Sequence, residues 1–190
     1  MPRPAIEVRV QGACFWEHAL LCALHRKDDA EYWVLPGGHL EPDESMWDAL
    51  VREFDEETGL AVENGHLWAL SEFRSPRRHV VDCTFAVTHF GGRTQLGTDP
   101  EAGDTPTLID VAWLDREAFV EARFRPTLLA RHLRAHWEDW GVPAAYRAVV
   151  ADSSRLRMPA GCERRSANAD RVDRSITEHG GGGAGRRNPS

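Results

Sequence analysis

Short runs of apolar, β-branched and aromatic residues recur through the first two thirds of the chain, and each is bounded by polar or turn-forming residues. Runs of this length and composition are typical of β-strands. We expect strands, in chain order, at residues 5–16, 18–25, 32–36, 66–73, 79–90 and 108–114, with a short continuation at 93–96 after a turn at Gly91-Gly92. A loop rich in Gly, Pro, Asp and Thr separates the last two strands.

Between Glu44 and Thr58 the pattern changes to a helical one. Apolar residues there recur at spacings of three and four, namely Met46, Trp47, Leu50, Val51 and Phe54. Gly59 follows the last turn, where glycine commonly ends a helix. Residues 115–122 and 126–140 are predicted as two further helices. The order of strands, helix, strands and helices indicates an α/β fold.

The composition changes near residue 150. Residues 151–190 contain no aromatic residue and end in GGGGAGRRNPS. We therefore expect one folded domain over residues 1–147 and a disordered, Arg/Gly-rich tail over 148–190. Nonspecific binding of nucleic acid by this basic segment is the alternative, but its five acidic residues dilute its charge.

The net charge of −7 hides an asymmetry between the domain and the tail. The last 40 residues hold eight arginines and five acidic residues, which leaves 15 basic and 25 acidic residues in the first 150. An acidic body does not favour a specific nucleic-acid partner. It accepts an anionic phosphate compound only if cations lie between the two.

The chain lacks the features of a membrane or secreted protein. No stretch approaches the roughly 20 apolar residues that a membrane span needs, and the first ten residues lack a signal-peptide pattern. We expect a cytoplasmic protein. Its four cysteines, Cys14, Cys22, Cys83 and Cys162, contain no CxxC pair, so neither a disulfide nor a structural zinc is expected. A Cys14–Cys22 bridge is the pairing left open, and a cytosolic compartment argues against it.

Three glutamates fall on one face of the predicted helix. Glu53, Glu56 and Glu57 stand at i, i+3 and i+4. Their mutual repulsion costs about 0.2–0.5 kcal/mol per pair, and the negative end of the helix dipole adds to it. Arg52 alone cannot neutralise three carboxylates. A hard divalent cation such as Mg²⁺ or Mn²⁺, which prefers oxygen ligands, is the second candidate.

A solvated, charged helix face is the alternative interpretation, and the surrounding residues argue against it. Residues 38–60 match every specified position of the Nudix box, namely Gly38, Glu44, Arg52, Glu53, Phe54, Glu56, Glu57, Gly59 and Leu60. A chance match somewhere in this chain has a probability on the order of one in a million. A strand ending at Leu35-Pro36 and a Gly-Gly loop supply the expected context. The chain therefore resembles the Nudix family.

The resemblance implies an α/β/α sandwich around a mixed β-sheet. It also implies a metal-dependent pyrophosphohydrolase that cleaves the phosphoanhydride bond of a nucleoside diphosphate linked to another moiety. That substrate would be a small molecule such as a nucleoside triphosphate, a nucleotide sugar, ADP-ribose, a dinucleotide or a dinucleoside polyphosphate. A homodimer is compatible with the resemblance. The alternative is a non-catalytic nucleotide-binding domain that acts as a sensor, which has no need to retain all the glutamates together with Arg52.

The resemblance also implies roles for individual residues. Glu53, Glu56 and Glu57 would bind Mg²⁺ or Mn²⁺ with a backbone carbonyl from the Gly37-Gly38 loop. Arg52 would hold the glutamates in register, and Glu44 would be an accessory ligand. Glu53 is our first choice as general base.

Other candidates have an ordinary structural interpretation beside the functional one. Glu101 and Asp104 are either a later catalytic acid or part of a solvated loop, and His39 is either a phosphate contact or a surface histidine. Stacking on a base or contact with phosphate is open to seven more residues: Trp16, Trp33, Trp68, Phe73, Arg74, Arg77 and Arg78. Aromatic residues in strands are more often core residues and an Arg-rich turn is more often solvated surface, so the sequence assigns no substrate.

Overall fold

The structure is a computed structural model that describes residues 5–27, 29–76, 78–98, 107–140 and 148–151. Several predictions concern positions outside these ranges, namely Arg77, Glu101, Asp104, Cys162 and the tail from residue 152 onward. Among the residues that are described, no helix has the length and apolar character needed to cross a membrane.

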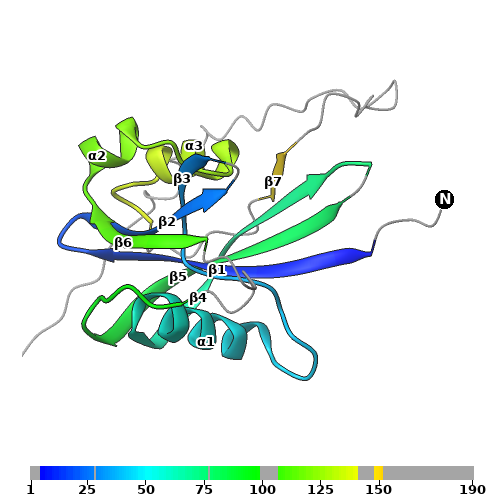
Figure 1. Cartoon of the computed structure of the whole chain (residues 1–190), viewed down its shortest axis with the longest axis horizontal. Helices are drawn as coiled ribbons and strands as arrows, with labels where there is room; N and C mark the ends of the chain where they lie inside the picture. Colours follow the sequence, from blue (N-terminus) through cyan, green and yellow to red (C-terminus); the bar gives the residue numbers. More distant parts are fainter. Residues whose placement is uncertain (1–4, 28, 77, 99–106, 141–147, 152–190) are drawn as a thin grey trace, which may run out of the picture. The chain divides into compact units, whose positions relative to one another are not determined.

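Seven strands within these ranges form a mixed β-sheet (Figure 1). They are β1 (Ile6–Trp16), β2 (Ala19–Lys27), β3 (Ala30–Val34), β4 (Leu60–Arg74), β5 (His79–Gly92), β6 (Leu108–Leu114) and β7 (Ala148–Ala151). The strand order is β3-β2-β1-β5-β4-β7, and β6 also pairs with β2. The β1–β5 and β4–β7 pairs are parallel, whereas the other pairs are antiparallel.

Helices cover both faces of this sheet. Helix α1 (Met46–Thr58) lies on one side, and α2 (Arg116–Glu121) and α3 (Thr127–Ala135) lie on the other (Figure 1). Successive residues of β1 serve the two layers in turn: Val10 and Cys14 pack in the core beneath α1, whereas Ala13 and Phe15 pack in the core with α2 and α3. Two cores on opposite faces confirm the predicted α/β/α sandwich.

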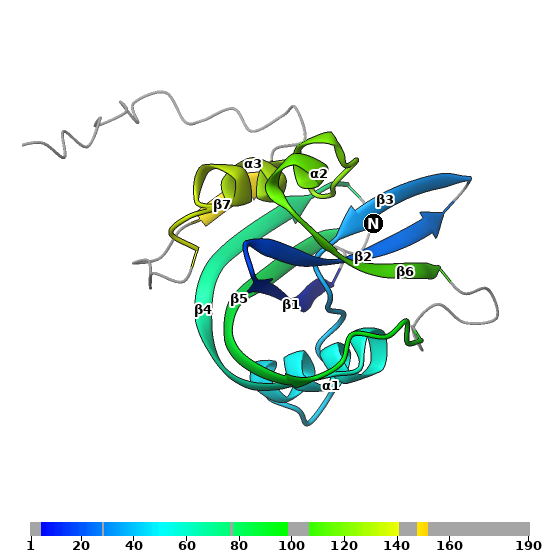
Figure 2. The same cartoon turned by 90° about the vertical axis from the view of Figure 1, so that its left-hand side faces the viewer.

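Strands β4 and β5 are long and curved (Figure 2). Their antiparallel register shifts in β4 at three places between Val62 and Ala69. Each irregularity of this kind bends a strand and increases its twist. This pair of strands contributes to both cores: Val62 and Phe85 pack towards α1, whereas Trp68 and Ala86 pack towards α3.

Helix α1 begins and ends at residues that the local sequence dictates. Ser45 is its N-cap and accepts a hydrogen bond from the Asp48 backbone, while Asp48 bonds back to the Ser45 backbone. Gly59 ends the helix in a left-handed conformation (φ +69°) and was the predicted stop. The predicted start at Glu44 was wrong by two residues, because Ser45 caps the helix and Glu44 precedes it.

Several elements differ from the sequence-based prediction. Strand β4 starts at Leu60 rather than at residue 66, and α3 ends at Ala135 rather than at residue 140. The predicted strand at 93–96 is absent from the described residues. Strand β7 begins directly after residue 147, where the domain was expected to end, so the folded unit continues at least to Ala151.

Cys14, Cys22 and Cys83 are buried free thiols. Burial raises the pKa of Cys14 to about 12 and that of Cys22 well above its ordinary value. Because the thiolate is the reactive form, these side chains act as small apolar core residues.

Candidate functional site

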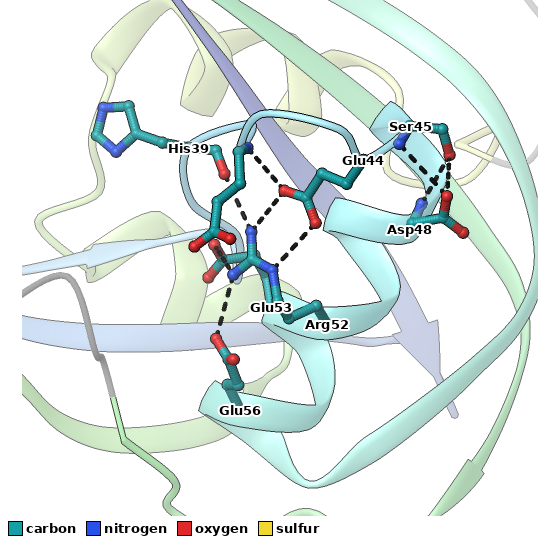
Figure 3. A network of polar contacts seen from close by, with 8 residues as sticks. His39, Glu44, Ser45, Asp48, Arg52, Glu53 and Glu56 are labelled. Carbon is teal, nitrogen blue, oxygen red and sulfur yellow. Dashed lines mark hydrogen bonds and ion pairs between the residues drawn. The ribbon is translucent and has the colours of Figure 1, made fainter.

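Arg52 is the centre of a network of carboxylates on α1 and the loop before it (Figure 3). Its guanidinium donates to Glu44 through Nε (3.2 Å) and Nη2 (2.8 Å), a side-on pairing with both oxygens of one carboxylate. Its Nη1 donates to Glu53 (2.8 Å) and to Glu56 (3.2 Å). A further bond from Nη2 reaches the His39 carbonyl (3.1 Å). One cation therefore holds three acidic side chains together.

Glu53 and Glu57 point inward towards the Gly37-Gly38 loop. Each is only 3% exposed, which is unusual for glutamate. The Glu57 carboxylate accepts the Gly37 backbone N–H (3.0 Å) and lies 3.7 Å from His25 Nε2. A Cβ atom on Gly38 would lie 2.2 Å from a carboxylate oxygen of Glu53. The loop thus lies directly against both carboxylates, and a side chain at Gly38 would have to displace the Glu53 carboxylate.

The same loop is fixed to β1 on its other side. The Val10 N–H donates to the Gly38 carbonyl (2.9 Å), and the Gly12 N–H donates to the Pro36 carbonyl (3.0 Å). The Gly38 carbonyl, predicted as a metal ligand, therefore already accepts one hydrogen bond and keeps a second lone pair. Strand β1 and helix α1 together hold the loop between them.

Residues 95–98 support the end of α1 that carries the glutamates. The N–H groups of Gln95, Gly97 and Thr98 donate to the carbonyls of Thr58, Glu57 and Glu56 at 2.8 to 3.0 Å. These carbonyls lie in the last turn, where a helix has no internal donors left. The backbone of this segment therefore bonds to α1 and not to a strand, which is why the predicted strand at 93–96 is wrong.

The electrostatics of the network follow from Arg52. Its hydrogen bonds hold the pKa of Glu44 below the ordinary value, and the bonds to Glu44 and Glu53 raise the pKa of Arg52 itself. In this arrangement the described residues contain no group of three histidine, cysteine or acidic side chains placed to hold a metal ion. The donors that do gather here are carboxylate oxygens, the ligand type that Mg²⁺ and Mn²⁺ prefer.

The lowered pKa of Glu44 leads to a pH-dependent stability. A carboxyl whose folded-state pKa lies below its unfolded value of 4.5 stabilises the fold above that value, and its contribution is lost as the pH falls through the folded-state pKa. We expect wild-type protein to lose more unfolding free energy than Glu44→Gln between about pH 5 and about pH 3. Urea denaturation at each pH measures this difference. Parallel pH profiles for the two proteins would contradict the assignment.

A cavity of about 680 Å³ lies beside the loop, on the α3 side of the sheet. Its polar lining includes Arg9, Gln11 and Asp82, and its other lining residues are Val34, Leu35, Phe73, Arg78, Val80, Arg125, Pro126, Thr127 and Leu128. Arg9 links the cavity to the loop, because its Nη2 donates to the Gly37 carbonyl (3.2 Å). A cavity of this size accommodates a nucleoside-sized group.

Of the remaining predicted residues, some line the cavity, some lie in the core and some lie at the surface. Phe73 and Arg78 line the cavity, and Arg78 is paired with Glu7. Trp68 is buried in the α3-side core and Trp33 packs against that core. Outside the cavity lining, Trp16 lies exposed against Trp113, Arg74 lies exposed near Glu72, and His39 forms an ion pair with Glu7 (3.4 Å).

Five polar cavity residues were missed by the sequence-based prediction: Arg9, Gln11, Asp82, Arg125 and Thr127. A signal for the first two was present. They occupy alternate positions of β1 on the face where Ala13 and Phe15 are buried, and polar residues on a core face are informative. Arg125, which lies over the Tyr32 ring (4.7 Å), carried no comparable signal.

Comparison with known proteins identifies the family. The NUDIX domain profile matches residues 9–137, which is more than half of the chain and includes the whole box. The chain belongs to the Nudix family. It is 36% identical over 74 residues to an ADP-ribose pyrophosphatase of Methanocaldococcus jannaschii, covering 38% of this chain and 44% of that protein. It is 32% identical over 111 residues to a MutT-like protein of Streptomyces ambofaciens, covering 58% and 65%.

The chain therefore spans less than half of the first relative's length and just under two thirds of the second's. Solved structures agree on the fold. A NUDIX hydrolase from Nitrosomonas europaea has a TM-score of 0.60 at 17% identity and covers 80% of this chain and 81% of its own. The MutT NUDIX hydrolase from Burkholderia pseudomallei has a TM-score of 0.57 at 21% identity, with coverages of 67% and 97%.

Proposed function

We propose that the protein is a metal-dependent hydrolase that cleaves a phosphoanhydride bond in a nucleoside diphosphate linked to another moiety. The observation that carries this proposal is the Arg52 network, which gathers Glu44, Glu53 and Glu56 beside a glycine loop (Figure 3). A fold does not need such a concentration of acidic side chains. Keeping like charges together costs stability unless they serve a ligand.

The oxygen donors that gather here are of the type that a divalent cation takes. Glu53, Glu56 and Glu57 would hold it, with Glu44 as an accessory group and the Gly38 carbonyl as a further oxygen donor. A bound Mg²⁺ or Mn²⁺ neutralises phosphate charge and lowers the pKa of a water molecule. The donors are oxygen atoms, and the glycine loop leaves no side chain between them and a substrate.

The protein's own side chains would divide the remaining work. Arg52 is a positioning residue, because its bonds to three carboxylates fix where they point. Glu53, buried beside the loop, is the first candidate to accept a proton from the attacking water. Arg9, bonded to the Gly37 carbonyl, lies between the loop and the cavity, where it would meet the phosphate nearest to the organic group.

The cavity would hold that organic group. The name of one relative, an ADP-ribose pyrophosphatase, supports a nucleotide derivative as the substrate class. The acidic body of the chain agrees with a mechanism in which cations mediate the approach of an anionic substrate.

A substrate panel tests this proposal. Purified protein with millimolar Mg²⁺ or Mn²⁺ is incubated with nucleoside triphosphates, nucleotide sugars, ADP-ribose, dinucleotides and dinucleoside polyphosphates, and the products are separated chromatographically. We expect at least one compound to be cleaved at a phosphoanhydride bond, and we expect a chelator to stop the reaction. Binding of a nucleotide without cleavage of any compound would refute the hydrolase and favour the sensor.

A further inference from the structure

We propose that Asp82 is a specificity-determining residue that selects substrates whose base offers two neighbouring N–H donors, the pattern found in guanine. The inference rests on the proposed function, because it assumes that the cavity holds the base of a nucleotide. It goes further by assigning a particular edge of that base to a particular side chain.

Asp82 belongs to a row of polar side chains on the floor of the cavity. In the parallel β1–β5 pair, Arg9 lies opposite Asp82 and Gln11 lies opposite Thr84. Gln11 Nε2 donates to Thr84 Oγ1 (2.9 Å), and Arg9 Nε lies 3.7 Å from Asp82 Oδ1. Two residues further along β1, the same sheet face is packed with apolar side chains of the α3-side core. Polar groups on such a face point to a ligand.

The Asp82 carboxylate has fewer partners than its burial demands. Its side chain is 16% exposed, and no described residue donates a hydrogen bond to its oxygens. The Arg9 contact at 3.7 Å is an ion pair beyond hydrogen-bonding distance. Burial raises the pKa of Asp82 even though Arg9, His39 and Arg78 all act to lower it. A ligand that brings N–H donors to these oxygens would relieve this cost.

The hydrogen-bonding groups of Asp82 and Gln11 determine which edge of a base can bind to them. A carboxylate accepts hydrogen bonds through both oxygens and donates none. An amide nitrogen carries two hydrogens, so Gln11 keeps one donor while it is bonded to Thr84. A base edge with one acceptor followed by two donors matches this pair, because the acceptor meets Gln11 and the two donors meet Asp82. Guanine offers such an edge through O6, N1–H and the 2-amino group. Adenine places an acceptor at N1, which would face a carboxylate oxygen and be repelled.

The cavity walls suit a flat ring above this floor. Phe73, Pro126 and Leu128 line the same cavity and provide apolar surface for a base. Arg9 reaches from the floor to the Gly37 carbonyl, so the phosphate end of a nucleotide would lie towards the glycine loop. The base edge and the phosphates thus have separate partners.

Binding measurements separate this inference from the proposed function. Calorimetric titration with GDP, IDP and ADP is carried out on wild type, on Asp82→Asn and on Asp110→Asn, an exposed site outside the cavity with the same loss of charge. We expect wild type to bind GDP about 10- to 100-fold more tightly than ADP. IDP, which lacks the amino group, should lie between them. Asp110→Asn should leave these ratios unchanged.

The Asp82→Asn variant should reverse the preference. Its amide offers one acceptor and one donor, which matches the N6–H and N1 of adenine, so GDP binding should weaken and ADP binding should strengthen. Circular dichroism confirms that the variant is folded, and the comparison of GDP, IDP and ADP on wild type needs no variant.

The outcomes discriminate between the two claims. GDP and ADP affinities within twofold of each other on wild type, or a GDP preference that persists in Asp82→Asn, would overturn the role of Asp82. Parallel assays with GTP, ITP and ATP and Mg²⁺ report hydrolysis. Selective binding of GDP without hydrolysis supports the inference and refutes the hydrolase, whereas hydrolysis without base preference supports the hydrolase and refutes the inference.

Discussion

Replacing Glu56 and Glu57 together by Gln is expected to lower kcat by about two to four decades, as loss of a charge-stabilising group typically does. Gln keeps the size of the side chain and can still accept the Gly37 N–H, so the bond that holds the loop survives. The substitution does remove the two negative charges that attract a cation. Steady-state kinetics on the best substrate of the panel, as a function of Mg²⁺ concentration, measure the loss.

Glu117→Gln/Glu121→Gln is a matched control. It removes the same two charges from exposed positions of α2, away from the glycine loop. Its kcat and its Mg²⁺ dependence should equal those of wild type, and thermal unfolding should confirm that both double variants are folded. Wild-type turnover in the Glu56/Glu57 variant would exclude these residues from the metal site.

Gly37→Ala is expected to destabilise the fold by roughly 2–5 kcal/mol, combining backbone strain with overpacking. Gly37 has a φ of +144°, which side-chain-bearing residues rarely adopt. A Cβ atom there would lie 2.1 Å from the Val10 carbonyl oxygen, which belongs to the backbone of the central strand β1 and cannot rotate away. Urea denaturation measures the change through the midpoint at constant slope.

Gly91→Ala provides the comparison. Its Cβ would lie 3.2 Å from the end of the Glu63 side chain, which is flexible, and its φ is not positive. We expect a change within about 0.5 kcal/mol of wild type, the ordinary range for surface substitutions. Equal unfolding midpoints for the two variants would show that the loop adapts to a side chain at Gly37.

Local spacing was enough to predict that the three glutamates share one helix and where that helix ends. The i, i+3 and i+4 positions of three glutamates and the stop at Gly59 depend only on helix geometry, and the structure places two of those side chains against the predicted glycine loop. The partners of Arg52 were only partly foreseeable. Glu44 pairs with Arg52 because Ser45 caps the helix and leaves Glu44 outside it.

The cavity was beyond sequence reasoning because it depends on strand register. Arg9 and Asp82 are 73 positions apart in the chain, and only the parallel pairing of β1 with β5 makes them neighbours. A shift of one residue would turn every side chain of β5 to the opposite face. No local pattern in either strand specifies that register, since both have apolar residues on each face.

In the segment after β5, hydrogen bonds to helix α1 replace the strand that the local sequence predicts. Gly91-Gly92 were predicted as a turn but are the last residues of β5, and residues 93–96 were expected to extend the sheet beyond them. The backbone of Gln95, Gly97 and Thr98 instead bonds to the last carbonyls of α1. The final carbonyls of any helix need donors, and these cannot be assigned before the packing is known. Strand β7 was missed for a similar reason: four residues are too few to predict a strand without knowing that the edge of β4 is open.

The Arg52 guanidinium donates hydrogen bonds to Glu44, Glu53 and Glu56 at once. These shared bonds limit which substitutions the protein can accept over evolutionary time. Lysine in its place would offer a compact charge that cannot span the same fan of oxygens. Loss of any one of the three acids would leave Arg52 free to rotate towards the others and displace them. Substitutions at these four positions are therefore tolerated only in combination, so the four should be inherited or lost as a unit.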